Sequence, residues 1–229
     1  MAPGAHVALN PAQAHYLGNV LRLATGARVL VFNGRDGEWS TVLTVVRRSA
    51  TLAADVRTRA QTGTADLHYL FAPLKAARLD YMTQKAVEMG ASRLQPVLTR
   101  RGQVTRVNVA RMRANAVEAA EQCGILALPD IEEPLPLAQL IAGWDPRRRI
   151  IFCDENAEVA SPVGTLSGLV RGPLAVLIGP EGGFADDERA ALLELPNVVR
   201  LTLGPRILRA DTAAVAALAL VQAVVGDWT

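Results

Sequence analysis

From Leu67 to Val225, strand-like segments alternate with helix-like segments. Short runs of branched aliphatic residues are followed by longer runs in which apolar residues recur every three or four positions. Strands that alternate with helices form a mainly parallel sheet that carries helices on both faces. An α/β fold is therefore expected, with strands at 67–73, 94–98, 149–153, 174–178 and 198–203 and helices at 79–89, 107–122, 186–195 and 212–225.

A different pattern, in which short β-like runs are separated by turn signals, precedes this alternation. The Asn-Gly and Asp-Gly pairs at 33–34 and 36–37 supply the φ > 0 positions that tight hairpins need. Segment 57–65 is polar and has no periodicity, which is typical of a domain boundary. We therefore expect a small antiparallel β-sheet or barrel in residues 1–64 and the α/β domain in residues 65–229. The first domain should contain strands at 28–32, 39–46 and 51–56 and a helix at 11–21.

Positive charge is concentrated in the first of these domains. Residues 1–64 contain seven arginines and three acidic residues, a net charge of +4, whereas the rest contains seventeen basic and nineteen acidic residues, a net charge of −2. A basic module joined to a more neutral body is typical of nucleic-acid-binding proteins, although an ordinary solvated basic face gives the same count. The candidates for contacts with a nucleic-acid backbone are Arg22, Arg28 and Arg47 in this domain and Arg101 in the next.

The cysteines and histidines do not form a metal-binding pattern. Cys123 and Cys153 are far apart and the three histidines are scattered, so no bound metal is expected. Two cysteines so far apart are typical of a protein in a reducing compartment. The residues after Met1 lack the basic and apolar regions of a signal peptide. The most apolar stretch, 213–225, contains Gln222 and is too short to span a bilayer. We expect a soluble, cytoplasmic protein with no membrane segment.

Two segments lie between a strand-like and a helix-like run, and each is expected to form a loop at the carboxyl edge of the sheet. They are 177–184, Leu-Ile-Gly-Pro-Glu-Gly-Gly-Phe, and 203–213, Leu-Gly-Pro-Arg-Ile-Leu-Arg-Ala-Asp-Thr-Ala. Open α/β folds bind ligands at this edge, so the two loops predict one site. The first loop is neither a Gly-x-Gly-x-x-Gly nor a Walker motif, so a pyrophosphate is not the expected ligand. Its exposed N–H and C=O groups suit an adenine edge, or the ribose and carboxylate of a nucleotide-like cofactor. A tight turn without a ligand is the alternative interpretation.

Charged residues in and after these loops are candidates for chemistry. The following helix already begins with three acidic residues, which are enough to stabilise its dipole without Glu181. Glu181 is therefore a candidate for contacting substrate or a cationic cofactor. Arg206 and Arg209 lie in a loop framed by glycine and proline and suit an RNA phosphate or a base edge. Asp211 or Thr212 is expected to cap the last helix, which would explain both without a role in a site.

Further motifs give the chain a resemblance to a known family. They are His-Tyr-Leu-Gly-Asn-Val-Leu-Arg-Leu at 15–23, Gln-Lys-Ala-Val-Glu-Met-Gly at 84–90 and Glu-Ala-Ala-Glu-Gln-Cys at 118–123, together with the two loops. With these motifs the chain resembles, nearly end to end, the RsmE-type enzymes, which are methyltransferases of the SPOUT superfamily. The resemblance implies an amino-terminal PUA-like RNA-binding β-barrel, a carboxyl-terminal domain with a trefoil knot, and a homodimer. It also implies that S-adenosyl-L-methionine is the cofactor and that N3 of a specific uridine in the 16S ribosomal RNA of the small (30S) subunit is the methyl acceptor.

For this reaction, individual residues acquire expected roles. Glu181 is the first candidate for accepting the proton of uracil N3 and Asp211 the second, while Arg206 and Arg209 would hold a flanking phosphate or offset charge on the uracil oxygens. Asp211 stands where the family usually has a glutamate. By resemblance, the cofactor pocket is expected to use the backbone of Leu177, Ile178, Gly179, Pro180, Glu181, Gly182 and Gly183, followed by Leu201, Leu203, Gly204, Ile207 and Leu208.

Two other functions are compatible with the sequence. A SPOUT enzyme that methylates a ribose 2′-hydroxyl shares part of the first loop, although the barrel and the Arg-Ile-Leu-Arg segment favour the N3 enzyme. A non-catalytic RNA-binding ribosome assembly factor could retain the same fold with a vacant pocket.

Overall fold

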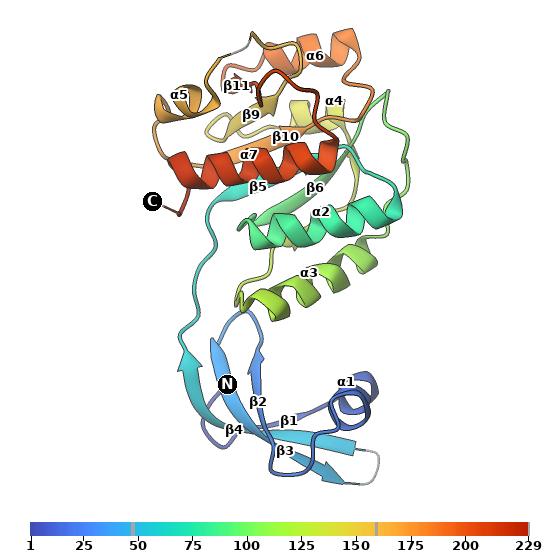
Figure 1. The fold of residues 1–229 in the computed structure, drawn as a ribbon, viewed down its shortest axis with the longest axis vertical. Coiled ribbons are helices and arrows are strands. Elements are labelled where there is room, and N and C mark those ends of the chain that lie inside the picture. The colour runs from blue at the N-terminus through green and yellow to red at the C-terminus, as the bar shows by residue number, and fades with distance from the viewer. Residues whose placement is uncertain (47–48, 159, 229) are drawn as a thin grey trace. The chain divides into compact units, whose positions relative to one another are not determined.

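The chain divides into two compact units. The computed structural model describes residues 1–46, 49–158 and 160–228. The units are Met1–Gly63 and Thr64–Thr229 (Figure 1).

The first unit is an antiparallel sheet with one short helix. Its strands are β1 (His6–Ala8), β2 (Arg28–Phe32), β3 (Glu38–Val46) and β4 (Ser49–Arg59). They pair in the order β1-β4-β3-β2, and every pair is antiparallel. The core of this unit is a small cluster of apolar side chains, Leu17, Leu43, Ala50 and Leu52.

The helix expected at 11–21 is present in two parts. The α-helix α1 (Pro11–His15) begins with a capping box, in which the Asn10 side chain accepts the Gln13 N–H at 2.9 Å and the Gln13 side chain accepts the Asn10 N–H at 3.1 Å. It continues into a π-helical turn, η1 (Tyr16–Val20). The chain widens there because the Leu21 N–H donates to the Tyr16 carbonyl, five residues back, at 2.9 Å.

The hairpin signals are confirmed, and one strand is longer than expected. The Asn33 side chain accepts the N–H groups of Arg35 and Asp36 at 3.1 and 2.9 Å, which tightens the turn between β2 and β3. Strand β4 continues to Arg59 rather than ending at residue 56. The polar end of this strand is stabilised by an ion pair of 2.7 Å between Arg59 and Glu38 of β3, which apolar periodicity cannot reveal.

The second unit is built on a parallel sheet, as the alternation of strands and helices predicts. Its strands are β5 (Leu67–Phe71), β6 (Arg93–Leu98), β7 (Asp130–Ile131), β8 (Leu135–Pro136), β9 (Arg149–Cys153), β10 (Leu174–Ile178) and β11 (Val198–Leu201). Their order is β11-β9-β10-β5-β6-β7, with β8 also paired to β6, and every pair is parallel. All five residues of the central strand β10 are buried.

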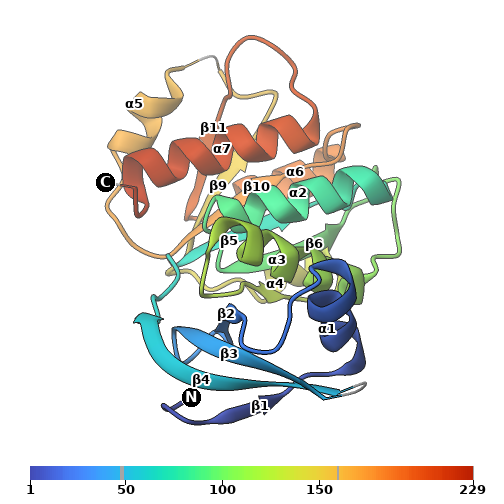
Figure 2. The same ribbon diagram turned by 60° about the horizontal axis from the view of Figure 1, so that its bottom comes forward.

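Helices cover both faces of this sheet, which confirms the expected layers. They are α2 (Ala76–Glu88), α3 (Val109–Cys123), α4 (Leu137–Ala142), α5 (Pro162–Ser167), α6 (Asp186–Leu193) and α7 (Ala210–Val225). Helix α7 packs on β10, α2 and α5, and α3 packs on α2, so these helices share one face (Figures 1 and 2). On the other face, Leu137 of α4 and Leu192 of α6 join a buried cluster with Phe152 and Leu177 of the sheet.

The sequence did not predict the short elements α4, α5, β7 and β8. Each contains six residues or fewer, too few for a period of apolar residues to be recognised. Over residues 1–46, 49–158 and 160–228, no helix combines the length and the apolar character needed to cross a bilayer.

Candidate functional site

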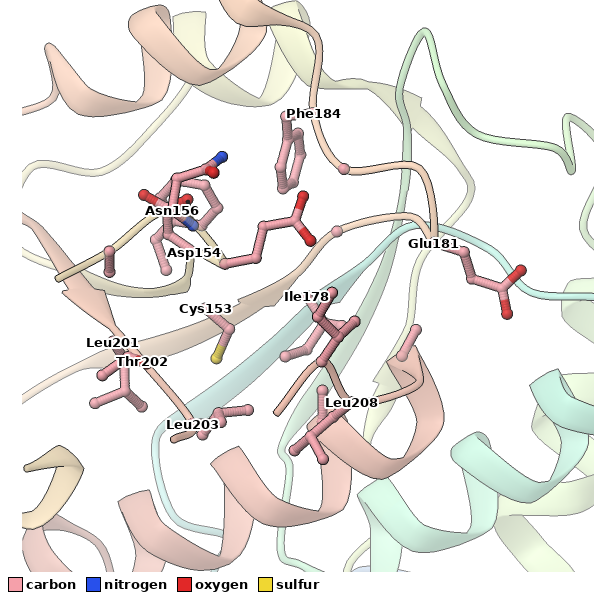
Figure 3. Close-up of a pocket in the computed structure, with 18 of the residues that line it drawn as sticks. Cys153, Asp154, Asn156, Ile178, Glu181, Phe184, Leu201, Thr202, Leu203 and Leu208 are labelled. Carbon is pink, nitrogen blue, oxygen red and sulfur yellow. Dashed lines mark hydrogen bonds between the residues drawn. The ribbon is translucent and has the colours of Figure 1, made fainter. Parts of the chain in front are cut away.

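A cavity of about 250 Å³ opens where β9, β10 and β11 end (Figure 3). Residues 154–157, which follow β9, form one wall. Two further walls come from the glycine-rich loop (residues 179–185) after β10 and the arginine loop (residues 202–209) after β11, and α7 contributes Ala210 and Ala213. The two loops that the sequence analysis identified therefore lie at one cavity.

In the glycine-rich loop, packing within the protein accounts for Gly179. A Cβ on this residue would lie 2.5 Å from Cε2 of Phe184. The Phe184 ring is buried and meets Phe152 edge to face, with ring centroids 5.3 Å apart. Ligand access is the expected reason for the loop's glycines, but at Gly179 the reason is different, because the aromatic ring of Phe184 occupies the space of a side chain.

A tight turn and a left-handed residue shape the rest of the glycine-rich loop. The Gly183 N–H donates to the Pro180 carbonyl at 2.9 Å, and Gly183 has φ +68°. A Cβ there would be strained and would also lie 2.7 Å from Oε1 of Glu155, which lines the cavity. The turn brings the loop back toward the segment after β9.

Arg101 lies beside the glycine-rich loop. Its Nη1 is 3.4 Å from the Gly182 carbonyl oxygen, and its Nη2 is 3.7 Å from Asp186 at the start of α6. The neighbouring Arg100 donates its backbone N–H to Glu188 at 2.9 Å, and Glu188 also accepts the Ala185 N–H at 3.0 Å. These contacts attach the segment after β6 to the loop and leave the Arg101 side chain half exposed.

In the arginine loop, residues 205–207 and 209 are exposed to solvent. Ile207 is 90% exposed. Arg206 lines the cavity, whereas Arg209 stands at the N-cap position of α7 and does not line it. Within the described part of the chain, neither guanidinium has a hydrogen-bond or ion-pair partner, so both are available to a ligand.

Asp211 does not cap α7, and neither does Thr212. The helix begins at Ala210, so both residues lie inside its first turn, and Arg209 at the N-cap makes no side-chain capping bond. The Asp211 carboxylate accepts the Thr212 N–H within that turn at 2.9 Å and two hydrogen bonds from Arg78 of α2, each of 2.9 Å. The Arg78 guanidinium holds the pKa of Asp211 below its ordinary value.

Glu181, the other candidate proton acceptor, is also paired with Arg78. Its side chain lines the cavity but is directed away from Cys153 and Leu203 (Figure 3). Arg78 could not be predicted from the sequence, because an arginine in an amphipathic helix carries no local sign of partners that lie more than a hundred residues away.

Asp154 is a second residue that the sequence analysis missed. It is 4% exposed and pairs at 2.8 Å with both Arg189 of α6 and Arg200 of β11. Burial alone would raise the pKa of Asp154, but hydrogen bonds from Arg189, the Asn156 N–H and Arg200 outweigh it and hold the pKa below its ordinary value. A polar Asp-Glu-Asn run directly after a predicted strand was the available signal.

Cys153, at the end of β9, forms part of the cavity wall. Burial raises the pKa of Cys153 to about 12, so its sulfur is a neutral thiol at physiological pH. It therefore contributes a weakly polar surface rather than a nucleophile.

Most residues expected in the cofactor pocket line this cavity. Leu177 and Gly182 do not, and Leu177 points into the core cluster shared with α4 and α6. Those that do are Ile178, Gly179, Pro180, Glu181, Gly183, Leu201, Leu203, Gly204, Ile207 and Leu208.

The arginines expected to contact nucleic acid in the first unit have different surroundings. Arg22 is exposed and adopts φ +54°, which is uncommon for a residue with a side chain. Arg28 donates to Asp55 at 2.7 Å and to Ser40 at 3.0 Å. Arg47 lies outside the described residues.

The lining of the cavity fits a nucleoside cofactor. Ile178, Leu201, Leu203 and Leu208 provide apolar surface for a flat ring (Figure 3). At Gly204, which has φ +98°, an added Cβ would meet no atom within 4 Å, so the space beside its backbone is free for a ligand. In the part of the chain that the structure describes, no three His, Cys, Asp or Glu side chains are grouped as metal ligands would be.

Comparisons with known proteins point to one family. Residues 61–222 match the model of the RNA methyltransferase domain, and residues 9–52 match that of the RNA methyltransferase PUA domain. Ribosomal RNA small subunit methyltransferase E of Rickettsia conorii is 28% identical over 210 residues, which cover 91% of this chain and 85% of that protein. The protein of the same name from Synechocystis is 29% identical over 225 residues, 96% of this chain and 74% of that protein.

Two solved structures are similar over almost the whole chain. One is the crystal structure of ribosomal RNA small subunit methyltransferase E from Neisseria gonorrhoeae, bound to S-adenosyl methionine, with a TM-score of 0.87 and 25% identity. The match covers 100% of this chain and 96% of the Neisseria chain. The structure of a putative methyltransferase from Legionella pneumophila, in complex with the same cofactor, has a TM-score of 0.84 and 28% identity. The match covers 99% of this chain and 95% of the Legionella chain.

Proposed function

The chain belongs to the RNA methyltransferase domain family, and from this we propose that it is an S-adenosylmethionine-dependent methyltransferase acting on N3 of a specific uridine in 16S ribosomal RNA. The observation that carries the proposal is the single cavity lined by both the glycine-rich and the arginine loop. Similar proteins named ribosomal RNA small subunit methyltransferase E, one of them bound to S-adenosyl methionine, support it.

The cofactor would be held by the walls of this cavity. The apolar side chains after β10 and β11 would contact the adenine, and open backbone groups of the two loops would bind its polar edge and the ribose. When bound, S-adenosylmethionine supplies an electrophilic methyl group. Calorimetry with S-adenosylmethionine tests this step, because a protein that only binds RNA would give no heat of binding.

The protein contributes mainly position and charge to the reaction. Holding the uracil nucleophile in line with a methyl group can supply roughly 7–11 kcal/mol. Arg206 lies at the cavity wall and Arg209 three positions later, and neither guanidinium has a partner among the described residues, so both can bind a flanking phosphate or the uracil oxygens. Replacing Arg209, which does not line the cavity, by alanine should lower turnover of RNA without weakening cofactor binding.

Glu181 is the better of the two candidate proton acceptors. Asp211 is bound side-on by Arg78, which lowers its pKa and makes it a weaker base. Glu181 lines the cavity and uses one contact to Arg78. Glu181→Gln should bind cofactor normally and lose methyl transfer. Normal binding with wild-type turnover would remove Glu181 from this role.

The first unit is proposed to bind RNA through its positive charge. Arg22 is exposed, and Arg28 is engaged with Asp55 at the surface, so Arg22 is the stronger candidate for a phosphate contact. Affinity for RNA should fall as salt rises, since each neutralised phosphate releases counterions. A flat salt dependence would contradict electrostatic binding by this unit.

Three further properties are proposed from the resemblance. We expect a homodimer, a trefoil knot in the second unit, and action in the cytoplasm, where ribosomal RNA is assembled. Sedimentation equilibrium at working concentration tests the first, and a monomer there would contradict it.

A further inference from the structure

Arg78 contacts both candidate proton acceptors although it does not line the cavity. Its Nε and Nη2 donate to the two carboxylate oxygens of Asp211, each at 2.9 Å, and its Nη1 donates to Glu181. Side-on pairing with Asp211 uses one edge of the planar guanidinium and leaves Nη1 for the second carboxylate. A single side chain of α2 thus binds two acids that come from different parts of the chain.

The two acids come from two different elements that contribute to the cavity wall. Glu181 is in the glycine-rich loop and itself lines the cavity. Asp211 is in the first turn of α7, directly after Ala210, which also lines it. Arg78 therefore joins the loop after β10 to the helix that follows the arginine loop. Among the described residues, it is the one cation paired with either acid.

Without this guanidinium the two carboxylates would lack their shared counter-charge. Like charges repel, and Glu181 lies in the exposed part of the glycine-rich loop, which can shift away from α7 more easily than the helix can. The rest of the loop has its own supports, because Phe184 packs under Gly179 and Arg101 reaches the Gly182 carbonyl. Loss of Arg78 should therefore change the local shape of the cavity and leave the fold intact.

We propose that Arg78 is a positioning residue of the cofactor cavity, which holds the glycine-rich loop against the start of α7 and so fixes two of the walls between which S-adenosylmethionine binds. The inference rests on the proposed function, because it takes this cavity as the cofactor site.

The test measures cofactor affinity by calorimetry on the full chain. At metal sites, loss of a residue that orients the binding groups costs about 10- to 100-fold, and because Arg78 is partly exposed we expect Arg78→Met to weaken binding roughly tenfold. Arg78→Lys keeps the charge but cannot pair side-on, so its affinity should lie between Arg78→Met and wild type. In the double variant Arg78→Met/Asp211→Asn the repulsion is removed, and affinity should recover toward wild type.

Arg111→Met provides a matched control. Arg111 of α3 makes an equivalent side-on pair with Asp80 of α2, at 2.9 and 2.6 Å, and neither residue lines the cavity. This control should bind the cofactor as wild type does, and thermal melting should show that all variants are folded.

Two results would overturn the role of Arg78. One is wild-type affinity in a folded Arg78→Met variant, and the other is a double variant that binds no better than Arg78→Met alone. Wild-type protein that gives no heat with S-adenosylmethionine would instead overturn the proposed function itself, and the role of Arg78 with it.

Discussion

Asp154→Asn should destabilise the protein far more than an exposed substitution of the same kind. The carboxylate of Asp154 is buried and joins three elements of the cavity, β9, α6 and β11, through Arg189 and Arg200. Asparagine has nearly the same size and can still accept the Asn156 N–H, which lies 3.1 Å away. The substitution therefore removes the charge and leaves two arginines without their counter-ion.

The size of the effect follows from how well the partners are solvated. Breaking a fully buried ion pair costs about 3–5 kcal/mol. The Arg189 and Arg200 side chains are 28% and 37% exposed, so water takes up part of their charge and we expect a loss of roughly 2–3 kcal/mol. For a chain of this size that corresponds to a fall in Tm of about 4–12 °C.

The assay is thermal and urea unfolding of the full chain, with Asp145→Asn as the control. Asp145 makes a comparable pair with Arg147 at 3.0 Å, but both side chains are exposed. An exposed ion pair adds little to stability, so Asp145→Asn should have the same Tm as wild type. Equal Tm values for the two variants would refute the reasoning that burial makes the Asp154 cluster a structural centre of the cavity.

Three further outcomes can be measured on the same protein. Gly179→Ala should lower both stability and cofactor affinity, because its Cβ would lie 2.5 Å from the Phe184 ring, and wild-type calorimetry and melting would contradict this. Burial lowers the pKa of His68 from 6.5 to about 4, so the unfolded state binds the extra proton and stability should fall as pH drops from about 6.5 to 4. The slope of Tm against pH should be smaller in His68→Gln than in wild type, and equal slopes in the two proteins would contradict the lowered pKa of His68. A thiol reagent should modify exposed Cys123 well before Cys153, whose pKa is about 12, and equal rates measured by mass spectrometry would contradict the raised pKa of Cys153.

The regular parts of the fold could be predicted from the sequence because their signals are local. Alternating strands and helices gave the parallel sheet, and the two loops after β10 and β11 could be placed at one edge because parallel strands all end there. Residues such as Ile178, Leu203 and Leu208 followed from their position in those loops.

The long-range charges could not be predicted in the same way. Arg78 meets Asp211 from 133 positions away, and Asp154 meets Arg200 from 46 positions away. The expected cap at Asp211 was a reasonable local reading, because an acid at a helix start usually needs no other explanation. Asp211 is the second residue of the helix, where its carboxylate accepts the Thr212 N–H and also two hydrogen bonds from Arg78 of α2, and only the folded chain reveals this long-range partner.

Methyl transfer to ribosomal RNA is the direct test of the proposed activity. The protein would be incubated with S-adenosylmethionine carrying a labelled methyl group and with 30S subunits that lack the modification, and the RNA would then be digested to nucleosides. We expect label in 3-methyluridine from one position of 16S ribosomal RNA. Label on a ribose 2′-oxygen, or no label in the RNA, would contradict it.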